Sequence, residues 1–357
     1  MARIRVGING YGTIGRRVAD AVALQPDMEV VGISKVRPDY KTGFIVYHGY
    51  ALYGDSNDSV LQLQAAGYPA IGTLDDLLGN VDVIVECAPP KLAARNKPRY
   101  EAAGVKQLFQ GGEKADVAPF SFNAQANYDM VVNAPSARVV SCNTTGMTRV
   151  LSELHRQFGV AKARVVIARK ATDPDDPHQG PVDGAVLDPS PAQVPAHHGH
   201  DVGEIIPGLN VFVMSARMPM THAHFHSLII SLKDPTVTRS QVMEVLLQTG
   251  RTLMVDSRTG IVSTMNVFDV GRELGRSRGD IYEGTIWEDS VTVEDGDVYM
   301  FMAVHQEAIV IPETIDAIRA IMGSGTKEES LRLTNQTLGI VQGRLNEHLL
   351  EPRRIFN

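Results

Sequence analysis

The chain of 357 residues contains only two cysteines, Cys87 and Cys142. Two cysteines are too few for the disulfide framework of a small secreted domain. No apolar run approaches the ~20 residues of a membrane-spanning helix. The first residues, MARIRVGING, lead into a strand-like pattern and not into the regions of a signal peptide. We therefore expect a cytoplasmic protein with reduced cysteines and no membrane partner.

Excess positive charge is also missing, because the formal net charge is −7. This charge argues against a broad nucleic-acid-binding surface, although a local basic site could still bind a phosphorylated metabolite. The sequence has no internal repeat and no low-complexity tract. Its length and its 43% of hydrophobic residues predict about two globular domains with large cores.

A glycine-rich turn lies between a predicted strand and a predicted helix near the start of the chain. In IRVGINGYGTIGRRVADAV, apolar residues alternate up to the turn and then recur at helical spacing. Gly10, Gly12 and Gly15 make the pattern G-x-G-x-x-G, which allows a tight turn, approach of a pyrophosphate and close helix–strand packing. In this context the motif predicts a dinucleotide site and not a glycine turn without a ligand.

The end of the next predicted strand, MEVVGISK, indicates which dinucleotide is bound. A site specific for NAD usually has an acidic residue there, whereas a basic residue suits the 2′-phosphate of NADP. The chain has Lys35 and Arg37 and no acid before Asp39. We therefore predict that NADP is accepted and preferred, mainly through Lys35; the alternative is that both are solvated surface charges.

Further buried strands are predicted at VDVIVECAPP and KQLFQGG. Cys87 ends the first of them and has the position of a small buried hydrophobic residue. Gly111 and Gly112 end the second, and they could let the backbone approach the nicotinamide.

Cys142 lies where a strand of the first domain leads into a predicted helix. The stretch RVVSCNTTGMTRVLSELHRQF places capping residues after the cysteine and then apolar residues at helical spacing. A helix N-terminus lowers the pKa of a thiol, and the thiolate is the better nucleophile. A structural cysteine is the alternative, but a thiol beside a dinucleotide fold favours aldehyde oxidation through a thioester.

Histidines supply candidates for the base. His197, His198 and His200 lie in a predicted loop, PAHHGHDV, and His222, His224 and His226 open a predicted strand on which they share one face. One of the strand histidines could act as general base for Cys142. The alternative is a three-histidine zinc site made by the loop and the strand.

The rest of the second domain is predicted to be a sheet of long strands with few helices. Strands are expected at ARVVIARKA, LNVFVMSARM, HAHFHSLIISLK and SVTVEDGDVYMFMAVH, and the last contains an Asp-Gly hairpin signal at 295–296. Residues 313–322 and 329–350 are predicted to be helical. The fold class is therefore α/β, with a Rossmann-type domain and an α+β domain that has a largely antiparallel or mixed sheet.

The sequence resembles the archaeal-type (class II) phosphorylating glyceraldehyde-3-phosphate dehydrogenases over nearly its whole length. The stretches that carry this resemblance are INGYGTIGRRVADA, FQGGEKA, RVVSCNTTG, HHGHDV, HAHF, GRSRGDI and AVHQEAIVIPE. The resemblance implies NAD(P)-dependent oxidation of D-glyceraldehyde 3-phosphate, with inorganic phosphate, to 1,3-bisphosphoglycerate in glycolysis or gluconeogenesis. It also implies a homotetramer, and a dinucleotide-binding domain of residues 1–141 and 306–357 around a catalytic domain of residues 142–305.

By position in the family motifs, Cys142 is the nucleophile and His222 the base, although the residues alone do not separate His222 from His224. The matched substrate positions are Ser141, Asn143, His197 and His198, and the matched cofactor positions are Thr13, Ile14, Gly112, Lys170 and Gln306. Arg169 and Lys170 end a strand and offer cations to phosphate. Many relatives have Arg at position 170, and a lysine there lacks the bidentate geometry of arginine. No resident metal is implied.

Three other functions remain open at this stage. A semialdehyde or acyl-phosphate dehydrogenase would share the cofactor fold, the thiol and the histidine. A metal-dependent hydrolase would use the histidine cluster. A redox-sensing regulator with a dinucleotide fold conflicts with the acidic balance and with the lack of a helix-turn-helix signal.

Overall fold

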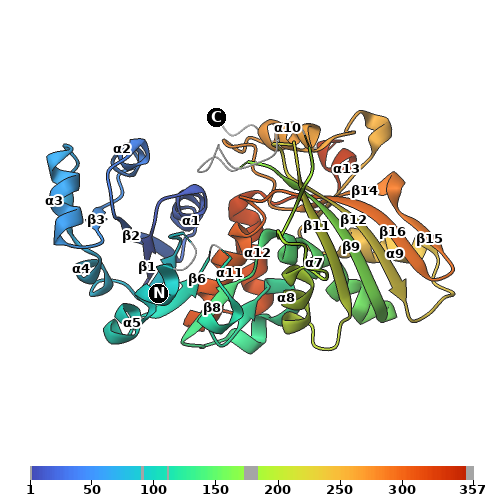
Figure 1. Ribbon diagram of the computed structural model, residues 1–357, viewed down its shortest axis with the longest axis horizontal. Helices are drawn as coiled ribbons and strands as arrows, with labels where there is room; N and C mark the ends of the chain where they lie inside the picture. Colours follow the sequence, from blue (N-terminus) through green and yellow to red (C-terminus); the bar gives the residue numbers. More distant parts are fainter. Residues whose placement is uncertain (1, 90–91, 111, 173–183, 351–357) are drawn as a thin grey trace. The chain divides into compact units, whose positions relative to one another are not determined.

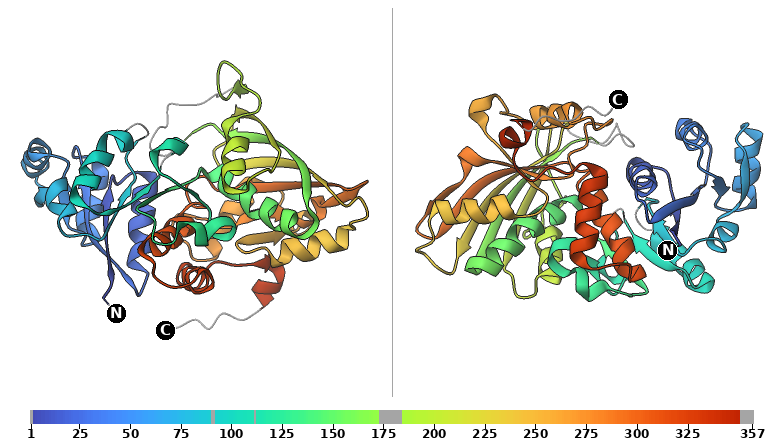
Figure 2. Two further views of the ribbon diagram at one scale, coloured as in Figure 1. Left: turned by 90° about the horizontal axis from the view of Figure 1, so that it is seen from below. Right: turned by 180° about the vertical axis from the view of Figure 1, so that it is seen from behind.

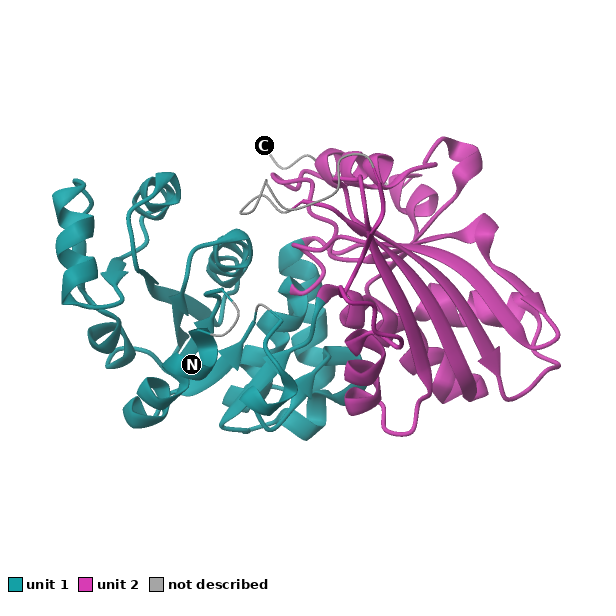
Figure 3. Cartoon of the chain, viewed as in Figure 1, with its two compact units in different colours: residues 1–141, 311–338 teal, residues 142–310, 339–357 magenta. Residues whose placement is uncertain are grey.

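A computed structural model describes residues 2–89, 92–110, 112–172 and 184–350 of the chain (Figures 1 and 2). The chain divides into two compact units (Figure 3). The first contains Met1–Ser141 and Ile311–Leu338, and the second contains Cys142–Val310 and the residues from Gly339 onward. Cys142 is therefore the first residue of the second unit.

Eight strands in the described part of the first unit form one sheet in which every pair is parallel. Their order is β4-β3-β2-β1-β5-β6-β8-β7. The strands are β1 (Ile4–Asn9), β2 (Met28–Lys35), β3 (Leu52–Gly54), β4 (Ala70–Thr73), β5 (Val83–Glu86), β6 (Lys106–Phe109), β7 (Ser121–Phe122) and β8 (Ser136–Val139). This parallel sheet confirms the predicted Rossmann-type domain.

Helices connect these strands. They are α1 (Thr13–Ala23), α2 (Tyr40–Tyr47), α3 (Asn57–Ala65), α4 (Leu74–Leu78), α5 (Leu92–Ala103) and α6 (Ala124–Asn127). The apolar side of α4 and the buried residues of β5, α5 and β6 make one core cluster, which includes Leu77, Ile84, Tyr100 and Phe109. Parallel strands need such crossover helices, and the helices bury both faces of the sheet.

Two C-terminal helices, α11 (Ile311–Met322) and α12 (Lys327–Leu338), belong to the first unit. Arg319 of α11 fixes them, because its buried guanidinium makes two hydrogen bonds of 2.7 and 2.8 Å to the Asp27 carboxylate and one of 2.7 Å to Gln25. Its third nitrogen donates to Thr334 of α12. The return to the first unit was expected over residues 306–357, but it is limited to Ile311–Leu338.

The second unit is built on a mixed sheet. Nine strands in its described residues pair in the order β10-β11-β9-β12-β16-β14-β13-β17, with β15 on β16. They are β9 (Val160–Lys170), β10 (Val186–Leu187), β11 (Val211–Met218), β12 (His224–Leu232), β13 (Thr252–Val255), β14 (Gly284–Trp287), β15 (Thr292–Glu294), β16 (Asp297–Val304) and β17 (Gly343–Arg344). The predicted hairpin is confirmed, since Asp295 and Gly296 both have positive φ between β15 and β16.

Helices α7 (Cys142–Phe158), α8 (His197–Ile205) and α9 (Arg239–Gln248) lie on the same side of this sheet (Figures 1 and 2). Helices α10 (Thr264–Glu273) and α13 (Leu345–Leu350) complete the unit. The helix predicted over residues 329–350 is interrupted. It ends before Gly339, which has a φ of +60°, and the chain then adds β17 to β13. The Val341 N–H donates to the buried Glu283 carboxylate and anchors this segment in the second unit. None of the helices in the described ranges is both long and apolar enough to cross a bilayer.

We predict that Arg319→Met lowers the free energy of unfolding by about 3 kcal/mol at pH 7, because a buried guanidinium and its hydrogen bonds are lost. Burial alone would raise the pKa of Asp27, but the hydrogen bond and charge of Arg319 lower it below the ordinary value. The stability that this pair contributes is therefore complete above about pH 5 and is lost as the pH falls through the lowered pKa.

Urea unfolding followed by far-UV circular dichroism measures this effect between pH 3 and 7. The exposed Arg332 of α12 provides the matched control, Arg332→Met, for which we expect no change. A difference between wild type and Arg319→Met that stayed constant down to pH 3 would contradict the role of Asp27.

Candidate functional sites in the two units

The glycine-rich turn of the first unit has a geometry that requires glycine. Gly10 has a φ of +96°, and a Cβ atom on it would lie 2.9 Å from the Ala88 nitrogen. A Cβ on Gly15 would lie 2.0 Å from the Gly10 carbonyl oxygen. Helix α1 begins directly after the turn, and no side chain caps its first N–H groups, because its N-cap residue is Gly12. The first N–H groups of α1 and the close backbone approach suit the pyrophosphate of a dinucleotide.

The buried carboxylate of Glu86 stabilises the backbone beside the glycine turn. Glu86, the last residue of β5, accepts hydrogen bonds of 2.6 to 3.0 Å from Tyr100, Asn96, Asn9 and the Ala88 N–H. These bonds fix the chain that follows β5 against the end of β1.

Cys87 lies in this segment, beside Gly15. Burial, and then the charge of Glu86, raise the pKa of its thiol well above the ordinary value. Both effects disfavour a thiolate and agree with the expectation that Cys87 is structural.

Lys35 is the buried last residue of β2, and its ammonium lies 2.6 Å from the Asp39 carboxylate. Asp39 also caps α2, because it accepts from the N–H groups of Lys41 and Thr42. The carboxylate of Asp39, the first acid after β2, is therefore engaged by the N–H groups of α2 and by the Lys35 ammonium. Arg37 is exposed.

Among the other cofactor positions, Thr13 and Ile14 open α1 and Gly112 is exposed with a φ of +76°, whereas Gly111 lies outside the described residues.

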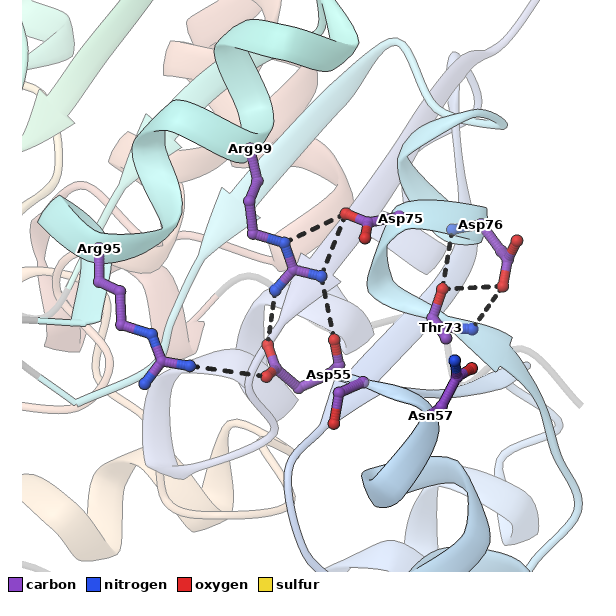
Figure 4. Close-up of a pocket in the computed structure, with 8 residues that line it drawn as sticks. Asp55, Asn57, Thr73, Asp75, Asp76, Arg95 and Arg99 are labelled. Atoms are coloured by element: carbon purple, nitrogen blue, oxygen red, sulfur yellow. Dashed lines mark hydrogen bonds and ion pairs between the residues drawn. The ribbon is translucent and has the colours of Figure 1, made fainter.

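A polar hollow of about 550 Å³ lies at the carboxyl ends of β3 and β4 (Figure 4). Figure 4 shows Arg95 and Arg99 of α5 pointing toward Asp55. Arg99 makes ion pairs of 3.0 and 3.1 Å with Asp55 and Asp75, and Arg95 lies 3.9 Å from Asp55. Because these cations are already paired with carboxylates, the hollow has no net positive charge for a cofactor phosphate.

Cys142 is the first residue of the 17-residue helix α7, and Ser141 precedes it at the end of the first unit. Burial raises the pKa of the Cys142 thiol to about 11, while the charge of Arg169 and the Asn143 N–H act in the opposite direction. The expected lowering of this pKa is therefore wrong, because withdrawal from water outweighs the helix N-terminus. Another group must take the proton if this thiol is to react near neutral pH.

Asn143 connects two buried histidines. Its Oδ1 lies 2.8 Å from His226 Nε2, and its Nδ2 lies 3.4 Å from His198 Nε2. Burial lowers the pKa of His226 to about 3 and that of His198 well below its ordinary value, so both rings are neutral near pH 7. The structure thus brings together Asn143 and His198, two of the expected substrate positions, and adds His226.

His197, His198 and His200 lie on helix α8 and not in a loop as predicted. Gly199 is the reason: a Cβ on it would lie 2.4 Å from the Val211 carbonyl oxygen, so the glycine allows close packing on β11 and does not break the helix. His197 is exposed, and its ring lies tilted against that of His198, with 3.9 Å between the ring centroids.

The loop-and-strand zinc site is not supported. Within the described ranges, there are two groups of three residues whose ligand atoms all lie within 4.8 Å of one another, and both groups are on α8. They are His197–His198–Asp201 and His200–Asp201–Glu204, and neither includes a strand histidine.

The three histidines of the predicted strand do not share one face. Strand β12 begins only at His224, and Ala223 before it has a φ of +57°. His224 and His226 are fully buried, whereas half-buried His222 lies outside the strand with its Nδ1 2.8 Å from Thr221 Oγ1 and its ring against Phe268. His224 Nδ1 accepts the Lys170 N–H at 3.0 Å, and its buried Nε2 has no hydrogen-bond partner in the described residues.

The two cations at the end of β9 both have acidic partners. Arg169 pairs with Asp188, which also lies 3.7 Å from Arg217. The buried Lys170 ammonium pairs with Glu307 Oε1, and Glu307 Oε2 lies 3.0 Å from His305 Nε2. Burial alone would raise the pKa of Glu307, but His305 and Lys170 hold it well below the ordinary value. Gln306, the remaining cofactor position, is half-buried between His305 and Glu307.

Glu307, His305 and Asp188 were missed from the sequence. Glu307 had one signal, namely an acid that directly precedes the apolar run AIVI. Asp188 had none, since its partner lies 19 residues earlier across a segment with no periodic pattern.

Known proteins are similar in sequence to this chain over nearly its whole length. Residues 141–273 match the family "Glyceraldehyde 3-phosphate dehydrogenase, C-terminal domain". The glyceraldehyde-3-phosphate dehydrogenase of Methanococcoides burtonii is 44% identical over 341 residues, which are 95% of this chain and 100% of that protein. The enzyme of Hyperthermus butylicus is also 44% identical, over 97% of this chain and its own full length, and that of Archaeoglobus fulgidus is 44% identical over 95% of this chain and 99% of its own.

The chain belongs to the archaeal-type glyceraldehyde-3-phosphate dehydrogenase family. It is therefore an oxidoreductase that uses a nicotinamide dinucleotide and a small-molecule substrate. This membership favours aldehyde oxidation over the metal-dependent and regulatory interpretations that the sequence left open. Both the glycine turn and the thiol at the start of α7 have a place in such an enzyme.

Proposed function

We propose that the protein oxidises D-glyceraldehyde 3-phosphate with NAD(P) and inorganic phosphate to 1,3-bisphosphoglycerate, reversibly, in the glycolysis or gluconeogenesis of the cytoplasm. The observation that carries this proposal is the position of Cys142, which opens α7 next to Asn143 and its two histidines. The alternative, a semialdehyde or acyl-phosphate dehydrogenase of the same fold, has no specific observation in its favour.

The first step is removal of the thiol proton, because burial raises the pKa of Cys142 to about 11. We assign this proton to His222. When its Nδ1 donates to Thr221 Oγ1, its Nε2 is left as a proton acceptor. His224 has the opposite arrangement, since its Nδ1 accepts the Lys170 N–H and the neutral ring must carry its proton on Nε2. His224 is therefore assigned as a hydrogen-bond donor to the substrate oxygen.

The thiolate then bonds to the aldehyde carbon while the carbonyl π bond breaks, and His222 returns its proton to the oxygen, which gives a thiohemiacetal. As the hydride leaves this carbon, the hydroxyl proton passes to His222. A bound nicotinamide supplies the hydride acceptor, and Thr13, Ile14, Gly112, Lys170 and Gln306 are the residues assigned to hold it. The thioester left on Cys142 is resolved when a phosphate oxygen bonds to the carbonyl carbon and the carbon–sulfur bond breaks. Ser141, Asn143, His197, His198 and Arg169 are assigned to the substrate and phosphate oxygens.

NADP is proposed as the preferred cofactor. Strand β2 ends in Lys35, and the following acid is neutralised by that lysine and by the N–H groups of α2. An acid held in this way is a poor acceptor for the 2′-hydroxyl of NAD. A 2′-phosphate could instead take the place of Asp39 at the Lys35 ammonium.

A homotetramer is proposed because the second sheet has an apolar face that no helix of the described residues covers (Figure 1). Met214, Val166 and Phe301 lie in one row across neighbouring strands and are 54%, 53% and 45% exposed. Such a face is typical of an interface between copies of a chain. Light scattering on the pure protein should give the mass of four chains, and a monomer would contradict the proposal.

The test of the reaction is NADPH formation from glyceraldehyde 3-phosphate and NADP, with and without inorganic phosphate. We expect sustained turnover only with phosphate, because phosphate must displace the thioester. Cys142→Ser should abolish turnover and leave cofactor affinity unchanged, whereas Cys87→Ser should keep turnover. Sustained turnover without phosphate would mean that water resolves the thioester, and turnover by Cys142→Ser would remove Cys142 from the mechanism.

The roles of the two histidines predict different losses. His222→Ala should lower kcat about 10²- to 10⁴-fold, as expected for a general base, and His224→Ala about tenfold, as expected for one hydrogen bond. Pre-steady-state NADPH bursts separate the chemical step from product release. A larger loss in His224→Ala than in His222→Ala would assign the base to His224.

Cofactor preference is tested by a pair of variants. Lys35→Met should lower the NADP-to-NAD ratio of kcat/KM about tenfold, because one charge-assisted hydrogen bond to the 2′-phosphate is lost. Asp39→Asn should raise this ratio, since asparagine still caps α2 but no longer pairs with Lys35. Lys41→Met is the control on the same segment. An unchanged ratio in Lys35→Met would contradict the proposal.

A further inference from the structure

The second unit contains a buried series of hydrogen bonds, and one of its members, His226, has no role in the reaction described above. The series runs from His226 of β12 through the side chain of Asn143 of α7 to His198 of α8. His226 is 0% exposed, Asn143 1% and His198 3%. Water therefore does not compete for these bonds, and the donors and acceptors must match along the chain.

The order of donors and acceptors follows from the amide. Asn143 Oδ1 can only accept, so His226 Nε2, at 2.8 Å, must carry the proton and donate it. Asn143 Nδ2 can only donate, so His198 Nε2, at 3.4 Å, must be the acceptor. A neutral imidazole has one N–H, so the proton of His198 lies on Nδ1.

The reverse orientation of the Asn143 amide is disfavoured by the surroundings of His226. With Asn143 Nδ2 toward His226, the proton of His226 would move to Nδ1, which is buried and has no partner in the described residues. A buried N–H donor without an acceptor is costlier than a buried acceptor without a donor. The environment of His226 thus fixes the amide, and the amide fixes the tautomer of His198.

We infer that His226 is a positioning residue, which acts through Asn143 to hold His198 as the Nδ1–H tautomer and so makes it a hydrogen-bond donor to anionic substrate oxygens. The inference rests on the proposed function in one respect, namely that His198 binds substrate or phosphate. The chain of hydrogen bonds itself does not depend on which substrate is bound.

The first readout is the tautomer of His198, measured by solid-state NMR of the sedimented, ¹⁵N-histidine-labelled full chain without substrate. Wild type should show a protonated Nδ1 at His198. His226→Leu removes the donor and should release this preference, whereas His226→Gln can still donate an N–H to Asn143 and should keep it. Asn143→Asp offers only acceptors, so it should move the His198 proton to Nε2.

The second readout is steady-state kinetics. His226→Leu should raise KM for glyceraldehyde 3-phosphate or for inorganic phosphate about tenfold, with a smaller change in kcat, since one hydrogen bond to a charged ligand is lost. His226→Gln should recover most of the affinity. His155→Gln is the control, because His155 accepts the Val160 N–H far along α7 and should change neither readout.

A wild-type tautomer in His226→Leu would overturn the inference, and so would a wild-type protein with the proton of His198 on Nε2. A changed tautomer with unchanged KM values would overturn the positioning role while leaving the reaction intact. Failure of the proposed reaction itself would be seen separately, as absence of turnover in the wild type. If His226→Leu does not fold, His226→Gln and Asn143→Asp still decide the tautomer.

Discussion

The buried ion pair between Lys170 and Glu307 organises the catalytic unit. Lys170 ends β9 and Glu307 lies in the turn after β16, and both side chains are only 3% exposed. A buried charge without its partner is strongly destabilising, so the two segments must stay together. The backbone of Lys170 also donates to His224, and the second oxygen of Glu307 faces His305. One pair thus holds the ends of two strands and the orientation of two imidazoles.

Strand β12 fixes the positions of His224 and His226 through its pairing with the neighbouring strands. It pairs with β9, which ends in Lys170, on one side and with β16, which leads to the turn of Glu307, on the other, and both strands fix its register. Its buried residues alternate, which places His224 and His226 on the covered face of the sheet. A shift by one residue would turn both imidazoles to the exposed face. The position of the histidines is therefore a property of the sheet and not of the local sequence.

Local sequence nevertheless predicted a large part of the molecule. The glycine turn was predictable because close backbone contacts leave no room for a Cβ at Gly10 or Gly15. Cys142 at the start of α7 followed from capping residues and helical spacing. Strands β9, β11, β12, β15 and β16 of the second sheet were predicted from the sequence, whereas β10, β13, β14 and β17 were not. The strand order could not be predicted either, since β11 and β9 pair in parallel across a long connection. His222 was misplaced because periodicity cannot reveal the positive φ of Ala223.

The ion pair could not be predicted at all, since its members lie 137 residues apart and each is plausible as a surface charge. It also accounts for a lysine at position 170. An ammonium is a compact point charge and engages a single carboxylate oxygen, here Oε1 of Glu307. Oε2 then remains for His305, whose Nδ1 already accepts the Ile281 N–H and whose proton must therefore lie on Nε2. A guanidinium that engaged both oxygens in a bidentate pair would compete with His305 for Oε2. The lysine and the histidine therefore face the two oxygens of the same carboxylate, and neither substitution at position 170 nor loss of His305 would leave the other contact unchanged.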